Sequence, residues 1–366
     1  MSETRRDAAS DTATEPAGRG LWQTLAQRWT LRRAPEPDPA RCVILGPVSS
    51  GKSALLFSLA RCVEADSHSY QDRLEVNLIH GNRDFDRFRG ASLARYFQEG
   101  LVVEATQIDS IARPRLTLAV HPKDGARLAR GRDREVAFTA FDGSGGLLLG
   151  RMDGEADLLS PQDLRQLDQK RRLEADALAE LNAALAESES AILCIPLAQS
   201  ITQEQTEAIA QRIHELRKRT RLQRLVVCFT MYEKLGRDMG RAAYRNLANR
   251  GAARRAMAVA LGGSRNGILK ALRLFDRHRR RGVWCVPVST YGFVPGNGGI
   301  NYDPQARTLL TRTPRGERAA PTVAAPYAFQ DAWSHWQPFC TIDPFVFIAT
   351  GDREGTLIHT LDELGL

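Results

Sequence analysis

Apolar and polar positions alternate between two patterns from residue 41 onward. Short apolar runs rich in β-branched residues predict strands at 42–46, 115–120, 135–142, 191–198, 225–230 and 283–289. Segments with apolar residues at helical spacing lie at 53–64, 161–189, 203–219 and in two stretches between about 241 and 280. This alternation predicts an α/β fold of three layers, with a mostly parallel sheet covered by helices on both faces.

The strands expected at 115–120 and 135–142 are joined differently from the others. The segment between them, HPKDGARLARGRDR, has no helical pattern. Strands that are joined without a crossover helix pair in antiparallel fashion. We therefore expect one antiparallel hairpin at an edge of the sheet.

The chain divides into three parts by composition. Residues 1–40 contain few large apolar residues and end in a Pro-rich stretch, so we expect a disordered, basic N-terminal segment. Within it, residues 21–29 have an amphipathic helical spacing that fits a membrane surface, a partner or the chain's own domain. Residues 41–292 form the main domain, and 293–366 begin as a long polar loop. The apolar stretch DPFVFIATG (343–351) should pack on the domain as a helix.

Charge and cysteine usage narrow the functional classes. The chain has 51 Lys and Arg against 43 Asp and Glu, but the basic clusters follow helical segments, where positive charge complements the helix dipole. We therefore expect no nucleic-acid partner. No apolar run reaches the roughly 18 residues of a transmembrane helix, and we find no secretory signal. The six cysteines form no CxxC pair. We expect a cytoplasmic protein.

The stretch GPVSSGKS (46–53) matches the pattern G-x-x-x-x-G-K-[ST] between a predicted strand and a predicted helix. Glycines allow successive backbone N–H groups to converge on a phosphate, Lys52 can reach the β- and γ-phosphates, and Ser53 can ligate Mg²⁺. The residues expected to bind phosphate in this loop are Gly46, Ser49, Ser50, Gly51, Lys52, Ser53 and Ala54.

A second motif lies at the end of the predicted strand 135–142. Asp142 is placed to hold Mg²⁺, and it begins the D-x-x-G sequence that ends at Gly145. With this motif after a P-loop, residues 41–292 resemble the Ras-like (TRAFAC) GTPases and their P-loop NTPase fold. The resemblance implies GTP and Mg²⁺ as cofactors and a contact between the Gly145 N–H and the γ-phosphate. It also implies that Thr106, in TQIDS, closes over Mg²⁺ and the γ-phosphate, with Thr117 as another candidate.

The resemblance also implies where the base is read. The family uses [NT]-K-x-D after the corresponding strand, and this chain has Thr230-Met231-Tyr232-Glu233, without the lysine. Glu233 would accept from the two donors of guanine. In VPVSTYG, Ser289 and Thr290 would offer a backbone N–H to guanine O6. Adenine stays open as the alternative because the lysine is missing.

Catalysis is the least complete part of the pattern. Gly146 stands where Ras-like proteins often have a glutamine that orients water. We expect a slow Mg²⁺-dependent GTPase that acts as a switch for a protein partner or a second GTPase, with Arg87, Arg89 and Arg95 as candidate helpers in cis. The layout loosely resembles the bacterial double-GTPase proteins of predicted conflict systems. A non-hydrolysing GTP-binding scaffold and a P-loop ATPase or phosphotransferase are the alternatives.

Overall fold

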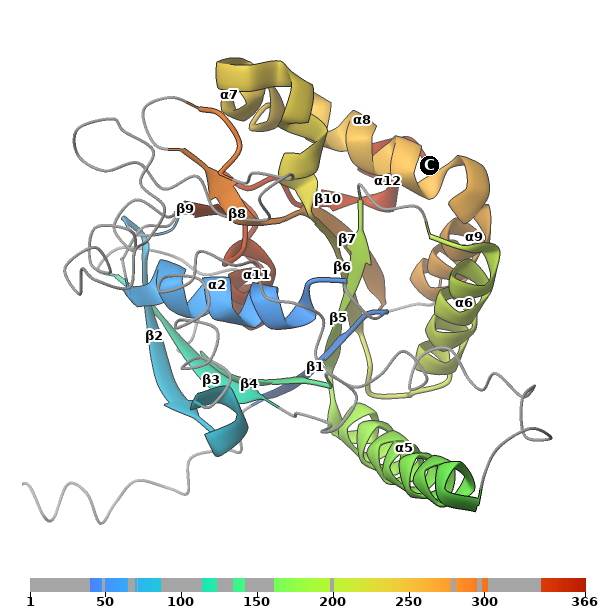
Figure 1. Ribbon diagram of the computed structural model, residues 1–366. Coiled ribbons are helices and arrows are strands. Elements are labelled where there is room, and N and C mark those ends of the chain that lie inside the picture. Colours follow the sequence, from blue (N-terminus) through green and yellow to red (C-terminus); the bar gives the residue numbers. More distant parts are fainter. Residues whose placement is uncertain are drawn as a thin grey trace, which may run out of the picture. The chain divides into compact units, whose positions relative to one another are not determined.

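Eight strands form the central sheet of the computed structural model, in the order β10-β7-β6-β5-β1-β4-β3-β2 (Figure 1). Their bounds are β1 (Ala40–Leu45), β2 (Leu74–Gly81), β3 (Arg115–Pro122), β4 (Arg134–Ala140), β5 (Ser190–Pro196), β6 (Arg224–Thr230), β7 (Gly282–Pro287) and β10 (His359–Thr360). The structure describes residues 40–47, 50–64, 70, 72–86, 114–123, 134–141, 161–197, 201–277, 281–294, 298–301 and 337–366.

The pairing of the strands confirms the predicted mixed sheet. β1 pairs in parallel with both β4 and β5, and β6 and β7 continue the parallel set. β3 pairs antiparallel with β4, as predicted for the hairpin. The structure adds β2 outside this hairpin, also antiparallel to β3. β2 has no continuous apolar run, because it buries Leu74 and Val76 while Glu75 and Asn77 between them are exposed.

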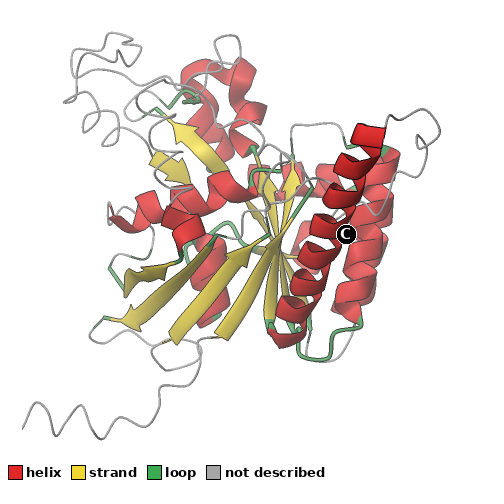
Figure 2. Ribbon diagram, turned by 60° about the horizontal axis from the view of Figure 1, so that its bottom comes forward, coloured by secondary structure: helices red, strands yellow, loops and turns green. Residues whose placement is uncertain are grey.

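Helices cover both faces of the sheet, which confirms the three layers (Figures 1 and 2). One face packs against α2 (Lys52–Glu64) and α11 (Asp343–Thr350). The other packs mainly against α5 (Pro161–Glu187), α6 (Gln203–Arg217), α8 (Arg250–Leu261), α9 (Asn266–Asp276) and α12 (Leu361–Leu364). Side chains of β1 alternate between the two cores, since Cys42 and Ile44 face the first and Val43 and Leu45 the second.

Between β6 and α8, the chain runs through the 3₁₀ helix η3 (Tyr232–Ala242) and α7 (Ala243–Leu247), and η4 (Gly263–Arg265) precedes α9. A separate two-stranded sheet pairs β8 (Ser289–Phe293) with β9 (Gln337–Phe339). β8 follows β7 almost directly, so its first residues lie where the parallel strands end. In the part of the chain that the structure describes, no helix has both the length and the apolar character needed to cross a bilayer.

Candidate functional site

The loop between β1 and α2 has a backbone that only glycine can follow at two places. Gly51 has a φ of 81°, in the left-handed region that favours glycine. At Gly46 a Cβ would lie 2.4 Å from Ser50 Oγ and 2.7 Å from the Cys194 carbonyl oxygen. The two glycines of the motif therefore allow the chain to turn tightly from the sheet into the helix.

Lys52 is the first residue of α2 and lies folded over this loop. Its side chain is buried, and Nζ donates to the carbonyl oxygens of Gly46 and Pro47, each at 3.0 Å. A buried ammonium at the amino end of a helix adds its charge to the positive end of the helix dipole. The Ser50 hydroxyl is buried in the same loop and has no hydrogen-bond partner among the described residues. This is an arrangement suited to an anion.

The end of β6 is tied to the same loop. The Thr230 hydroxyl donates to the Ser50 carbonyl oxygen at 2.6 Å. The backbone N–H of Tyr232 donates to the Val288 carbonyl oxygen at 3.2 Å, and the N–H of Val288 to Phe229 at 2.8 Å. These bonds hold the ends of β1, β6 and β7 together, so that the loop and the segment after β6 share one site.

Glu233 is the most unusual side chain at this site. It is 0% exposed, and neither carboxylate oxygen has a hydrogen-bond partner among the described residues. Burial raises the pKa of the Glu233 carboxyl. The Ser289 hydroxyl, the Glu233 backbone N–H and the charge of Lys234 lower this pKa only in part. A buried carboxyl without partners is costly, which points to a ligand that supplies donors.

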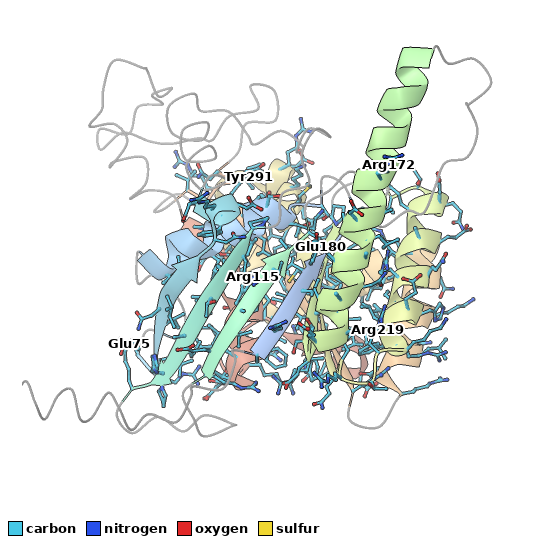
Figure 3. All side chains as sticks on the ribbon, turned by 90° about the horizontal axis from the view of Figure 1, so that it is seen from below. Glu75, Arg115, Arg172, Glu180, Arg219 and Tyr291 are labelled. Atoms are coloured by element: carbon cyan, nitrogen blue, oxygen red, sulfur yellow. The ribbon has the colours of Figure 1, made fainter. Side chains whose placement is uncertain are left out.

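Ser289 and Thr290 open β8 and are both buried. The Ser289 hydroxyl accepts from the Gly292 N–H at 2.8 Å, so it stabilises the local turn while lying close to Glu233. In Figure 3, Tyr291 of the same strand lies toward the end of the central sheet where the parallel strands finish. Glu75 and Arg219 lie toward the end where these strands begin.

The structure thus brings together part of the predicted set from three distant segments: Gly46, Ser50, Gly51, Lys52, Ser53, Ala54, Thr230, Glu233, Ser289 and Thr290. Thr117 lies within β3, paired with Ala137. The other predicted residues lie outside the described ones, and they are Ser49, Thr106, Asp142, Gly145, Gly146, Arg87, Arg89 and Arg95.

Of the three predicted metal ligands, the structure describes one. Ser53 lies in the first turn of α2, and Thr106 and Asp142 lie outside the described residues. Within the described ranges, no three His, Cys, Asp or Glu residues are grouped closely enough to hold a metal ion. Ser53 is therefore the one predicted metal ligand that lies within the described residues.

Two side chains at the site were missed from the sequence. Met231 has a φ of 61°, which is uncommon for a residue other than glycine. Lys234 places Nζ 3.3 Å from the Met231 sulfur. In the motif [NT]-K-x-D the lysine corresponds to position 231, so the motif itself does not point to Lys234. The sequence signal for Lys234 was its position next to Glu233.

Comparison with known proteins places few limits on this chain. No family model and no curated protein matches it. Among solved structures, two chains from work on an oligomerised bacterial dynamin pair, described as sensing and tethering membranes, resemble it at TM-scores of 0.26 and 0.25. Each is 11% identical over 75% of this chain, and the match spans 43% and 36% of their own lengths. Likeness of this degree carries no argument about fold or function.

Proposed function

We propose that this chain binds GTP with Mg²⁺, hydrolyses it slowly and acts as a nucleotide switch for a protein partner. The observation that carries the proposal is Glu233, a fully buried carboxyl that has no hydrogen-bond partner among the described residues and lies close to the loop 46–53. Both halves of a nucleotide, base and phosphates, then have a complementary group at one edge of the sheet.

The chemistry of Glu233 favours guanine over adenine. Guanine presents N1–H and the N2 amino group side by side, and a carboxylate can accept from both at once. Adenine presents a bare N1 acceptor at the same place, which would face the carboxylate unfavourably. A guanine base would therefore satisfy the two Glu233 oxygens, which have no donor among the described residues.

The phosphates would be held by the loop and the start of α2. The backbone N–H groups of the loop, the helix terminus and Lys52 supply positive charge, and Ser53 would hold Mg²⁺ with Thr106 and Asp142. Magnesium neutralises the charge that develops on the transferred phosphoryl group. Because Thr230 is bonded to Ser50, the segment that reads the base and the loop that binds the phosphates form one unit.

Hydrolysis is proposed to depend on help from elsewhere. Gly146 has no side chain that could orient water, so a protein partner or a second GTPase would complete the site or respond to the GTP-bound state. The motifs support our proposal that the chain is a GTPase of the TRAFAC class, and the layout supports a looser likeness to the bacterial double-GTPase proteins of predicted conflict systems. The same Gly146 favours a second candidate function, a GTP-binding scaffold that does not hydrolyse.

Calorimetric titration of GTP and of ATP into purified protein tests the nucleotide assignment. Lys52→Ala should weaken both nucleotides by about 2 kcal/mol or more, because it removes charge-assisted contacts to phosphate. Glu233→Ala should weaken GTP by roughly 1–3 kcal/mol and should not weaken ATP, because the carboxylate faces the adenine N1 acceptor unfavourably. Asp238→Ala is the matched control, since Asp238 is an exposed carboxylate of the same helix η3.

Two results would contradict the proposal. If ATP binds as tightly as GTP, the guanine assignment is wrong. If Lys52→Ala binds both nucleotides as the wild type does, the loop is not the phosphate site.

A further inference from the structure

The stretch from η3 to the first half of α8 carries many basic side chains at the surface. Residues 234–255 contain seven Lys and Arg and one acidic residue, Asp238. Six of the seven basic residues are exposed, and they are Arg237, Arg241, Arg245, Arg250, Arg254 and Arg255. Within the part of the chain that the structure describes, none of these six arginines forms an ion pair. This surface is therefore strongly positive.

The helix dipole does not account for this charge. Basic side chains complement the carboxyl end of a helix, as Arg217 does in the last turn of α6. Arg250 is instead the first residue of α8, whose first turn has no acidic residue, and the amino end of a helix is itself positive. The Arg250 side chain donates to the Thr356 carbonyl oxygen at 2.9 Å, and the nearby Glu363 carboxylate accepts from Arg353 at 2.7 Å. An acidic group from another molecule would reduce the repulsion at this helix end.

Large apolar side chains are exposed among the arginines of η3 and α7. Leu235 is 37% exposed, Met239 is 40% exposed and Tyr244 is 48% exposed. Tyr, Met and Arg are enriched at protein–protein interfaces, whereas Lys, Glu and Asp are depleted there. Arginine makes up six of the seven basic residues of this stretch, so its composition is typical of a surface that binds protein.

The segments that carry these side chains are packed against the rest of the domain. The Tyr244 ring lies edge-on to Phe293 and to Phe339, with centroids 5.5 Å and 6.0 Å apart. A Cβ at Gly236 would lie 2.8 Å from the Ala243 Cβ, so η3 and α7 are in close contact. α7 leads into α8, and the two helices follow one another along the top of Figure 1. A surface that is ordered before binding loses little conformational entropy when a partner binds.

We propose that the exposed side of η3, α7 and the first half of α8, the arginine surface, binds an acidic segment of a protein partner that also carries apolar side chains. Carboxylates of the partner would accept from the guanidinium groups, each of which can donate two hydrogen bonds to one carboxylate. Apolar side chains of the partner would cover Leu235, Met239 and Tyr244. No residue of the arginine surface is assigned to the nucleotide or to Mg²⁺, so the inference goes beyond the proposed function.

A nucleic acid would match the charge of the arginine surface but not its apolar side chains. Phosphate oxygens accept hydrogen bonds and form ion pairs, and they offer nothing that would cover Leu235 or Met239. A protein segment supplies both kinds of contact. The two polymers are therefore distinguished by what happens when an apolar side chain is removed.

Two pairs of variants test the two kinds of contact. The first variant removes three exposed arginines of η3 and α7 in one protein: Arg237→Gln, Arg241→Gln and Arg245→Gln. Its matched control loses the same charge at three exposed arginines outside the arginine surface: Arg217→Gln, Arg221→Gln and Arg277→Gln. The second pair is Met239→Ser and its control Leu274→Ser, because Met239 is 40% exposed and Leu274 is 39% exposed.

The probe is a fluorescently labelled peptide in which Glu and Leu repeat at helical spacing, and its anisotropy is measured at about 0.15 M salt. The same peptide with Ser in place of Leu and a single-stranded oligonucleotide of equal charge are the comparison probes. The wild type should bind the Glu–Leu peptide about 10-fold more tightly than either of them. The triple variant of η3 and α7 should bind it about 3- to 100-fold more weakly and Met239→Ser about 3- to 10-fold more weakly, with both controls unchanged. A melting temperature for each protein shows that it is folded.

Three results would overturn the inference. An equal loss of peptide affinity in the two triple variants would mean that net charge alone attracts the peptide. Tighter binding of the oligonucleotide than of the Glu–Leu peptide, lost in the triple variant of η3 and α7, would assign the arginine surface to nucleic acid. No measurable binding of the Glu–Leu peptide to the wild type would also contradict it. None of these measurements involves a nucleotide, so each result leaves the proposed function to its own test.

Discussion

Two charged side chains of the site, Lys52 and Glu233, are buried, and they differ in their hydrogen bonds. Lys52 is buried with its ammonium bonded to two loop carbonyl oxygens. Glu233 is buried with no such compensation among the described residues, and its pKa is raised because burial disfavours the charged form. Lys52 is therefore placed to bind an anion. The burial of the Glu233 carboxyl lowers the stability of the folded state, and a ligand that donates hydrogen bonds to it would offset this loss.

The raised pKa of Glu233 predicts a pH dependence of stability in the nucleotide-free protein. The folded state holds the Glu233 proton more tightly than the unfolded state, where the pKa is about 4.3. The contribution of this proton to stability is therefore complete below about pH 4.3 and is lost as the pH rises through the folded pKa. Glu233→Gln has no proton to lose, so its melting temperature should rise relative to wild type as the pH increases.

Melting curves of wild type and Glu233→Gln, recorded at steps from about pH 4 to pH 8, provide the measurement. Asp238→Asn serves as the control for an exposed carboxylate of η3. Two melting-temperature profiles that stay parallel throughout this range would show that Glu233 titrates in the folded protein as it does in the unfolded chain.

Among the elements, α11 shows how the C-terminal part of the chain joins the core. All eight of its residues are buried. The Phe345 ring lies edge-on to Phe138 of β4, with centroids 4.8 Å apart. The carbonyl oxygens at its end accept from arginines of two strands, Ile348 from Arg224 at 2.8 Å and Ala349 from Arg134 at 3.4 Å. These bonds satisfy helix-terminal groups that have no partner within the helix.

Removal of the Phe345 ring should therefore destabilise the whole domain. Phe345→Ala is expected to lower the free energy of unfolding by about 3–5 kcal/mol, because it deletes a fully buried aromatic ring and leaves a cavity. Leu274→Ala on α9 is the control, since Leu274 is partly exposed to solvent. Denaturant unfolding gives both values, and a loss below about 1 kcal/mol in Phe345→Ala would show that α11 is not part of the cooperative core.

At the scale of the whole molecule, the site is assembled from the carboxyl ends of strands that are far apart in the sequence. The loop after β1, the segment after β6 and the start of β8 meet at the carboxyl ends of the parallel strands. Ligands of open α/β sheets bind outside these carboxyl ends. The groups proposed to act on the γ-phosphate come from a fourth and a fifth segment, around Thr106 and Asp142, outside the described residues.

This division predicts tight nucleotide binding with slow turnover in the isolated chain. Without a side chain at position 146 to align water, basal hydrolysis should run near 10⁻³ to 10⁻⁴ per second, roughly the rate of an unassisted small GTPase. Single-turnover release of phosphate from purified protein measures it, with Lys52→Ala as the inactive control. Several turnovers per second without a partner would mean that the chain carries its own apparatus, with Arg87, Arg89 and Arg95 as the first candidates.

The sequence alone determined the features that depend on neighbours along the chain. Strand periodicity, crossover helices and the glycines of residues 46–53 predicted the α/β class and the tight turn between β1 and α2, because local sterics and amphipathic faces decide them. Only the tertiary structure showed that β2 forms the sheet edge, since a strand buried on one side has a weak apolar signal. Only the tertiary structure also showed that Glu233 is buried without a hydrogen-bond partner among the described residues. The same holds for the bonds from Thr230 to Ser50 and from Lys234 to Met231. These features depend on groups that are distant in the sequence and are brought together by folding, or on the left-handed backbone of Met231, which its residue type does not favour.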